Sequence, residues 1–384
     1  MAAYYACYFA AIGVLEPYLV LLWGSFGFTP AQIGVLAAIP SCIAIVAPSL
    51  WTAIADVTRR GERIFAWNTI ATACVALLLP SALGPILAAL LLATLAFLRA
   101  PLIPLANSMT FRALNNDRSR YASIRLWGTI GYILAAIAAG VFIDRVGIAL
   151  GILGAGVALG GAAAIAATGP SRRGTPLSSA QWRAMFDLVR DRHLLVVLAT
   201  TALARVSSGA YDTFFSIHLA VLGFSKTFAG CAWALAAGSE LILMLGWHRL
   251  RVRRSARQGL MIALASHALR WLLSAFAEGP IAVLAIQPLH AFTFGAFYLA
   301  SVERMDELAP AGLRATAQGL FASCAFGLGG TLGSLWAGAL FARLGMAGLY
   351  MVATVLSAGA TLFYAVRGQS AEALAVTGHG KAAG

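Results

Sequence analysis

The sequence predicts an all-α polytopic membrane protein, with twelve transmembrane helices in two pseudo-symmetric bundles of six. Three observations lead to this fold class. Of the 384 residues, 60% are hydrophobic and 11% are charged, whereas soluble domains carry roughly 25% charged residues. Apolar runs of about 20 residues, each long enough to cross a ~30 Å hydrocarbon core, recur along the whole chain. Short motifs of the first half also return in the second half at a nearly constant offset.

The hydrophilic segment 169–192 divides the chain into halves of similar length. We expect residues 1–168 to form an N-terminal bundle and residues 193–366 a C-terminal bundle, followed by the tail 367–384. The expected spans are 4–26, 31–55, 64–82, 86–110, 122–143, 147–168, 193–221, 229–247, 258–277, 280–301, 314–341 and 345–366. The five cysteines lie scattered in apolar runs without a CxxC pair. We therefore expect no disulfide, no metal site and no cofactor.

The formal charge of +13 is spread over the joints between spans and does not form one patch. This distribution predicts contact with the lipid bilayer and not with nucleic acid. Joints on one side of the membrane, with the tail, carry 21 of the 27 Lys and Arg residues, and the other side has Arg145, Lys226 and Arg343. By the positive-inside rule, both termini and the central segment are cytoplasmic, and we expect a monomer in the inner membrane.

Two pairs of motifs mark an internal repeat. GFTPAQIG at Gly27–Gly34 returns as GFSKTFAG at Gly223–Gly230, an offset of 196 residues. GVFIDRVG at Gly140–Gly147 returns as GALFARLG at Gly338–Gly345, an offset of 198 residues. Repeats of this length with six spans each are typical of the two halves of a major facilitator.

A family resemblance agrees with the repeat. YASIRLWGTIGY at Tyr121–Tyr132 resembles the fifth-helix signature of the phenylpropionate-permease-like branch of the major facilitator superfamily, near the oligosaccharide and nucleoside proton symporters. Further matches in both halves are PLIPL at 101–105, WALAAGSE at 233–240, LHAFTFG at 289–295 and AQG at 317–319. The resemblance implies the major facilitator fold and proton-coupled uptake of a small molecule by alternating access between the bundles.

Charged residues inside the spans are the candidate functional residues. A charge at the bilayer centre costs about 2.5–3.5 kcal/mol on insertion scales, so each one needs a partner or a water-filled cavity. Asp212 lies at the repeat offset of 196 from Glu16, so the first helix of each half offers a carboxylate at the same level. The candidates for the substrate or proton pathway are Glu16, Arg99, Asp212, Glu240, Arg270 and His290, with Arg205, Tyr211, His267 and Gln287 as secondary candidates.

The chemistry of these residues suggests separate roles, and structural alternatives stand beside them. A carboxyl group buried in an apolar helix, as we expect for Glu240, is able to bind and release a proton near neutral pH. Arginine stays charged, so Arg270 is expected to pair with Glu240 or with an anionic substrate. Alternatively, Glu16 holds helices together by pairing with an arginine, and His290 is a structural group. Arg205 and Asp212 lie seven residues apart on one helix face, so the alternative there is an internal salt bridge.

Helix breaks and helix ends add further expectations. Pro101 and Pro104 free the carbonyl groups of Phe97 and Ala100, next to Arg99, and Pro288 breaks the helix beside Gln287. Broken helices near the midplane often line binding sites. Asp56 and Arg125 lie at cytoplasmic helix ends. They either form a cytoplasmic gate between helices or snorkel to the membrane surface.

We therefore expect a secondary transporter, with an aromatic or other carboxylic acid as the favoured substrate. The alternatives within the fold are a proton symporter of sugars or nucleosides and an exporter of drugs or metabolites. A membrane-embedded enzyme is not expected, because the sequence has no HExxH, GxSxG or P-loop motif. A sensor with an output domain is not expected either, because only a short tail follows Arg367.

Overall fold

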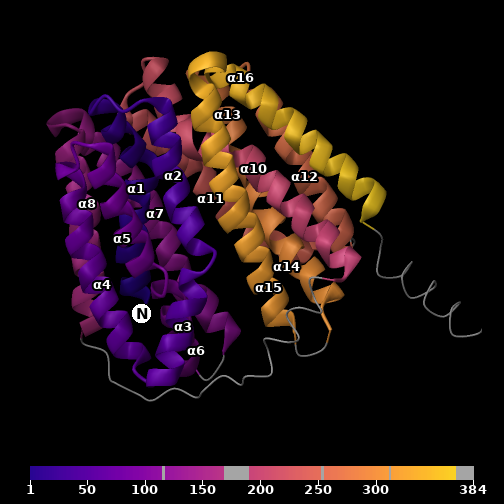
Figure 1. The fold of residues 1–384 in the computed structure, drawn as a ribbon, viewed down its shortest axis with the longest axis horizontal. Helices are drawn as coiled ribbons and strands as arrows, with labels where there is room; N and C mark the ends of the chain where they lie inside the picture. The colour runs from indigo at the N-terminus through magenta and orange to yellow at the C-terminus, as the bar shows by residue number, and fades with distance from the viewer. Residues whose placement is uncertain (115–116, 168–189, 252–254, 311–312, 369–384) are drawn as a thin grey trace, which may run out of the picture.

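The computed structural model describes residues 1–114, 117–167, 190–251, 255–310 and 313–368, and this part of the chain is helical with short connections. The tail after Gly368 and most of the expected central segment 169–192 lie outside the described residues. Figure 1 shows long helices running up and down the molecule, with the N-terminal half (indigo to purple) beside the C-terminal half (pink to yellow).

The N-terminal half consists of α1 Ala2–Ser25, α2 Pro30–Ala44, α3 Ala47–Thr58, α4 Gly61–Leu78, η1 Leu79–Ser81, α5 Pro85–Arg99, α6 Leu102–Ala113, α7 Arg118–Val146 and α8 Ile148–Ala167. The C-terminal half consists of α10 Arg192–Val221, α11 Lys226–Arg251, α12 Ala256–Ser274, α13 Pro280–Ile286, η2 Gln287–Leu289, η3 Ala291–Ala296, α14 Phe297–Leu308, α15 Arg314–Ala322, η4 Ser323–Gly329 and α16 Gly330–Arg367.

These elements give the twelve membrane crossings expected from the sequence. Ten helical stretches of the described chain are long and apolar enough to span a bilayer. The last of them, Thr316–Arg367, has 52 residues and bends at Gly345, so it crosses twice. The remaining crossing is α12, which is not among the ten and carries two polar residues needed below, His267 and Arg270.

Prolines set the interruptions inside three crossings. The expected helix 31–55 is divided between α2 and α3, because Pro48 has no N–H to donate to the Ala44 carbonyl group. The predicted break at Pro101 separates α5 from α6, and the Trp51 indole N–H donates to the freed Phe97 carbonyl group at 2.9 Å. Pro288 lies in the 3-10 turn η2, after which η3 continues as a π-helix.

The internal repeat is present in the backbone geometry. Gly27 and Gly223, at the offset of 196, have φ angles of 78° and 83°. Gly147 and Gly345, at the offset of 198, have φ angles of 95° and 61°. Residues with a Cβ atom rarely adopt a positive φ angle. Both copies of each motif therefore have a glycine where the chain turns, at the same end of each half. We call this end the far end (the top of Figure 1), and we call the opposite end, where the N-terminus and α3 lie, the basic end.

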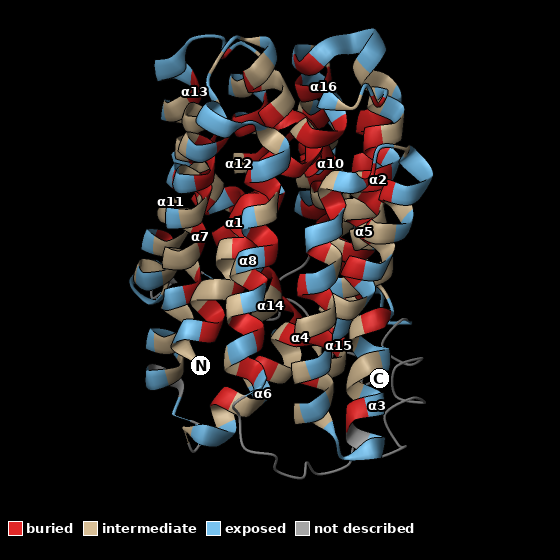
Figure 2. Cartoon of the chain, turned by 90° about the vertical axis from the view of Figure 1, so that its left-hand side faces the viewer, coloured by how far each residue is buried: buried red, intermediate tan, exposed pale blue. Residues whose placement is uncertain are grey.

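Within the described residues, the halves meet mainly along two seams: α2 packs against α16, and α7 packs against α11. In the first seam Gly34 faces Gly338, and in the second Gly230 faces the backbone of Ala136, which leaves no room for a side chain at either glycine. Within the halves, α1 packs against α7 and α8, and α10 against α16. Buried residues line the inner faces of the helices, and exposed residues the outside (Figure 2). Apolar side chains such as Ile86, Ile242 and Leu362 are at least 67% exposed, as expected for surfaces that contact lipid.

Candidate functional site

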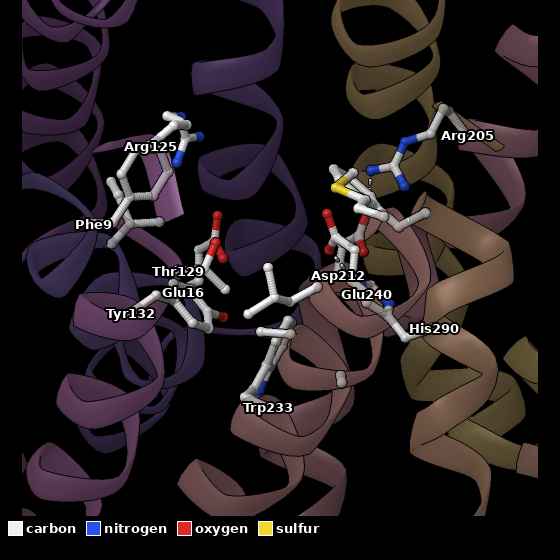
Figure 3. A pocket seen from close by; sticks show the side chains of 16 residues that line it. Phe9, Glu16, Arg125, Thr129, Tyr132, Arg205, Asp212, Trp233, Glu240 and His290 are labelled. Atoms are coloured by element: carbon white, nitrogen blue, oxygen red, sulfur yellow. Dashed lines mark hydrogen bonds and ion pairs between the residues drawn. The ribbon is translucent and has the colours of Figure 1, made fainter. Parts of the chain in front are cut away.

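A cavity of about 430 Å³ lies between the two halves. This volume falls in the range of small-molecule sites, roughly 300–1,000 Å³. Its lining comes from α1, α7, α10, α11 and the broken crossing that contains η3 (Figure 3). The lining residues are Phe9, Ile12, Glu16, Arg125, Thr129, Tyr132, Arg205, Asp212, Trp233, Ala236, Ala237, Glu240, Leu241, Met244, His290 and Phe294.

Glu16 and Asp212 lie in this cavity on equivalent helices of the two halves. In α1, Glu16 is the one exposed residue within the buried run 11–20, and in α10 Asp212 is the one exposed residue within the buried run 207–216. Because the neighbours on both sides are buried, the two carboxylates are exposed to the cavity and not to lipid. The Tyr132 hydroxyl group faces Glu16. No arginine lies within 4 Å of the Glu16 carboxylate among the described residues.

Arg205 and Asp212 form the internal salt bridge that was the structural alternative, with Nη2 and Oδ2 2.5 Å apart. The seven-residue spacing puts both side chains on the cavity face of α10. The Arg205 guanidinium also lies over the rings of Phe294 and Phe326, at 5.9 and 5.2 Å from the centroids. Arg205 is therefore already neutralised and held in place.

Glu240 faces His290 across the C-terminal half, with Oε2 and Nε2 3.7 Å apart (Figure 3). The two side chains are 21% and 15% exposed, and both line the cavity. The other ring nitrogen of His290, Nδ1, lies 2.9 Å from Nη1 of Arg270. These three residues form a chain of contacts from the cavity wall into the interior of the C-terminal half.

Arg270 lies behind this wall and is 1% exposed. Its Nη1 also donates to the Thr293 hydroxyl group at 2.9 Å, and its Nη2 to Gln287 Oε1 at 3.3 Å. The guanidinium stacks over Tyr211, 4.2 Å from the ring centroid. The expected direct pairing of Arg270 with Glu240 is not what the structure has, because the His290 ring lies between them.

Two secondary candidates belong to the same network. The Tyr211 hydroxyl group donates to Gln287 Oε1 at 2.9 Å, and Gln287 Nε2 donates to the Val283 carbonyl group at 2.9 Å. Pro288, which follows Gln287, begins the departure from regular α-helix that presents Gln287 and His290 to Arg270. The π-helix η3 then places Thr293 against the same guanidinium.

Two further candidates, Arg99 and His267, lie outside the cavity. Arg99 is half-buried at the end of α5 and does not line the cavity. His267 is fully buried, with Nδ1 2.9 Å from the Ala263 carbonyl group, and packs against Trp271 and Phe297 outside the cavity.

The structure places one of the two residues expected at a cytoplasmic gate. Arg125 lines the cavity and stacks over Phe9, 4.0 Å from the ring centroid. The backbone of Asp56 belongs to α3, but its side chain lies outside the described residues.

Several lining residues were not singled out from the sequence, among them Phe9, Thr129, Tyr132 and Met244. Helical spacing contains the signal that would have found them. Arg125, Thr129 and Tyr132 are separated by four and three residues, and the α11 lining residues 233, 236, 237, 240, 241 and 244 follow the same period. Residues at these intervals share one helix face, so the face that contains Glu240 predicts the rest of the wall.

Comparison with known proteins gives consistent results. The model of the MFS_1 like family matches residues 1–352. The maltose permease of Geobacillus stearothermophilus is 26% identical over 373 residues, which cover 96% of this chain and 94% of the permease. The probable 3-phenylpropionic acid transporter of Escherichia coli K12 is 26% identical over 310 residues, 79% of this chain and 80% of that protein.

A crystal structure of the nucleoside transporter NupG superposes with a TM-score of 0.84, covering 96% of this chain and 98% of that one at 16% identity. The relatives are transporters and not enzymes. With the family model matching most of its length, the chain belongs to the MFS_1 like family of the major facilitator superfamily and is a multi-pass membrane protein of the secondary-transporter class.

Proposed function

We propose that the protein carries a small, neutral, ring-bearing and hydroxylated solute across the membrane together with a proton. The observation that supports this proposal best is the position of Glu240. It is a carboxylate on the wall of a cavity between the halves, and it faces a histidine whose other nitrogen is bound by a buried arginine.

The contact between Arg270 and His290 determines which group takes the proton. Arginine has only hydrogen-bond donors and stays charged. His290 Nδ1 must therefore accept from Arg270, so the ring is neutral and its hydrogen is on Nε2, directed toward Glu240. Placing a second proton on the ring requires breaking the bond to Arg270. Glu240 is consequently the proton-binding group, and His290 and Arg270 are positioning residues.

The cavity wall favours a solute that offers hydrogen-bond donors. Three carboxylates line it, those of Glu16, Asp212 and Glu240, while Arg205 is already paired with Asp212. An anionic solute meets the charges of Glu16 and Glu240, whereas hydroxyl groups donate to the same oxygens. The indole of Trp233, held by a 3.0 Å bond to Ser216, lies between the two walls and offers apolar surface to a ring (Figure 3). The similarity to a maltose permease agrees with a sugar-like solute.

An aromatic carboxylic acid, the substrate favoured from the sequence, is the second candidate. The observation in its favour is Arg125, a cation on the cavity wall that has no hydrogen bond or ion pair among the described residues and stacks on an aromatic ring. The similarity to a probable 3-phenylpropionic acid transporter points the same way.

Coupling follows from the charge on Glu240. When Glu240 is ionised, it and Glu16 on the opposite wall place two carboxylate charges in the cavity, with Arg125 as the unpaired cation of the lining among the described residues. The protonated carboxyl group keeps a carbonyl oxygen that accepts from a solute hydroxyl group, and it adds an O–H donor. Protonation also removes the cost of burying an ionised carboxylate when the solute displaces water, so each ligand favours binding of the other. Because of this mutual dependence, the protein that crosses between the two conformations carries both the solute and the proton.

We also propose that the basic end faces the cytoplasm of a cell with the protein in its inner membrane, since the positive-inside rule assigns arginine-rich joints to that side. The cavity lining extends from Trp233 toward Phe9 and Met244, which lie nearer the basic end. The conformation is then inward-facing. A cysteine placed at Thr58, after replacement of the native cysteines, is expected to react with an impermeant maleimide only from the cytoplasmic side. Labelling from the outside contradicts this orientation.

Uptake into proteoliposomes tests the proposed function. The purified protein is reconstituted, an inward proton gradient is imposed, and radiolabelled maltose, uridine and 3-phenylpropionate are supplied in parallel. We expect gradient-driven uptake of maltose or uridine, abolished by a protonophore. Uptake of 3-phenylpropionate alone supports the second candidate. If none of the three responds to the gradient, the proposal is wrong.

A further inference from the structure

Asp144, in the last turn of α7, contacts the other half of the molecule at the far end. Its Oδ1 accepts from the backbone N–H of Lys226 at 2.9 Å, and its Oδ2 accepts from the N–H of Thr227 at 2.8 Å and from the Thr227 hydroxyl group at 2.7 Å. These are the first two residues of α11. One carboxylate of the N-terminal half thus binds the N-terminus of a helix in the C-terminal half.

The contact with α11 compensates an unfavourable position of Asp144 in its own helix. A carboxylate in the last turn of a helix lies at the negative end of that helix's dipole, where it is unfavourable. The N-terminus of α11 supplies the opposite sign, together with N–H groups that have no partner within the helix. Ser225 caps the next N–H, that of Phe228, at 3.1 Å. Asp144 therefore completes the cap of a helix in the other half.

Tyr18 of α1 also binds the first residue of α11, from the interior of the molecule. It is fully buried, and its hydroxyl group lies 2.6 Å from the Ala136 carbonyl oxygen and 3.0 Å from that of Lys226. Gly140 and Gly230 lack the Cβ atoms that would collide with this hydroxyl group. The first residue of α11 is thus bonded at both its N–H and its carbonyl group by the N-terminal half.

Comparison of the two repeats shows that the described part of the α2–α16 seam has no counterpart of the contact between Asp144 and α11. At the offset of 198 residues, Asp144 corresponds to Ala342, which has no polar group. The helix equivalent to α11 in the N-terminal half, α2, is capped locally by Thr29 and Gln32 and begins with Pro30, which has no N–H. The α2–α16 seam meets at Gly34 and Gly338, and its nearby hydrogen bond, from Ser323 to the Ile45 carbonyl group, lies at the other end of α2. At the far end, the polar connection among the described residues is therefore at the α7–α11 seam.

We propose that Asp144, Tyr18 and the N-terminus of α11 form a latch that holds the far end closed and must open once in each transport cycle. This inference rests on the proposed alternating-access function. Opening the far end separates α7 from α11, and the three bonds to Asp144 are then lost together. Asp144 is a gating residue that touches neither the solute nor the proton site. The strength of its hydrogen bonds to α11 sets the balance between the conformation with the far end closed and the one with it open.

Spin-label distance measurements on the full chain test the latch. The five native cysteines are replaced, and labels are attached at Leu83 and Glu278, exposed positions at the far end in different halves. A second protein carries labels at Thr58 and Arg249, at the basic end. In Asp144→Asn we expect the ratio of long to short far-end distances to rise at least about fivefold, since charge-assisted bonds are lost, and the basic-end distances to shorten.

Arg145→Gln is the matched control, because Arg145 is an exposed charged neighbour with no hydrogen bond to α11 among the described residues. It should leave both distance distributions unchanged. Thr227→Val and Tyr18→Phe keep side-chain volume and should give smaller shifts in the same direction, which covers the case that Asp144→Asn does not fold.

Unchanged distances in all three latch variants overturn the proposal, and so does a far-end change without the reciprocal change at the basic end. No solute is needed for this measurement. A shift of the distances in a protein that transports none of the tested solutes leaves the latch standing and contradicts the proposed function instead.

Discussion

Proteoliposomes containing Glu240→Gln are expected to exchange solute but not to accumulate it. Glutamine keeps the shape of the protonated side chain and cannot release a proton, so solute binding survives while coupling is lost. With one proton per solute, a gradient of one pH unit supports about tenfold accumulation by the wild type, since each pH unit is worth about 1.4 kcal/mol. The variant should reach a ratio near one.

The measurement compares two assays on the same preparation: uptake driven by a pH step, and counterflow of labelled against unlabelled solute without one. Glu278→Gln is the matched control, because Glu278 is an exposed carboxylate at the far end and does not line the cavity. It should retain accumulation. Accumulation by Glu240→Gln means that Glu240 is not the coupling site, and Asp212 becomes the next residue to test.

Replacing Arg270 by methionine is expected to abolish transport almost completely. The side chain is 1% exposed and holds His290, Thr293 and Gln287 at once. Without the arginine, the buried acceptors of His290 and Thr293 lose their donor, at about 1–3 kcal/mol each, so we expect counterflow to fall about thirtyfold or more. Arg270→Lys keeps the charge but loses the planar arrangement of donors, and it should restore part of the activity.

Arg257→Met is the control for this experiment. Arg257 is also an arginine of α12, but it binds backbone carbonyl groups at the end of α16 and does not line the cavity. It should leave counterflow within about threefold of the wild type, the size expected for a surface hydrogen bond. Near-normal counterflow in Arg270→Met contradicts the positioning role of Arg270.

The fold was predictable because membrane spans depend on properties that are local in sequence. Length and hydrophobicity located the crossings, and glycines at the repeat offsets marked equivalent turns at Gly27 and Gly223. The span 31–55 was located correctly, as the stretch Pro30–Ala55, but its interruption before Pro48, between α2 and α3, was not predicted. The break at Pro101, which has the same cause, was predicted.

Part of the candidate site was predictable as a list of residues, and less of it as a network. Glu16 and Asp212 were expected at equivalent positions, and both line the cavity. The insertion of His290 between Arg270 and Glu240 was not foreseen. It depends on the 3-10 and π turns around Pro288, which rotate the following residues away from ideal α-helical positions. Spacing rules for a regular helix cannot give that rotation.

Asp144 was quoted from the sequence only as part of a repeated motif. Its importance depends on which helix N-terminus lies opposite, and that is a property of the packed halves. The difference from Ala342 in the second copy of the motif was the available signal. A carboxylate present in one copy of a repeat and absent from the other indicates a contact that the two halves do not share.

Proton movement accompanying solute entry tests the central claim most directly. Wild-type proteoliposomes in weakly buffered medium, with valinomycin and potassium to compensate charge, receive maltose, uridine or 3-phenylpropionate while the external pH is recorded. For the transported solute, we predict an alkalinisation outside that corresponds to one proton per solute molecule and is absent from Glu240→Gln. Entry of labelled solute into the wild type with no pH change beyond that of protein-free liposomes contradicts proton-coupled transport.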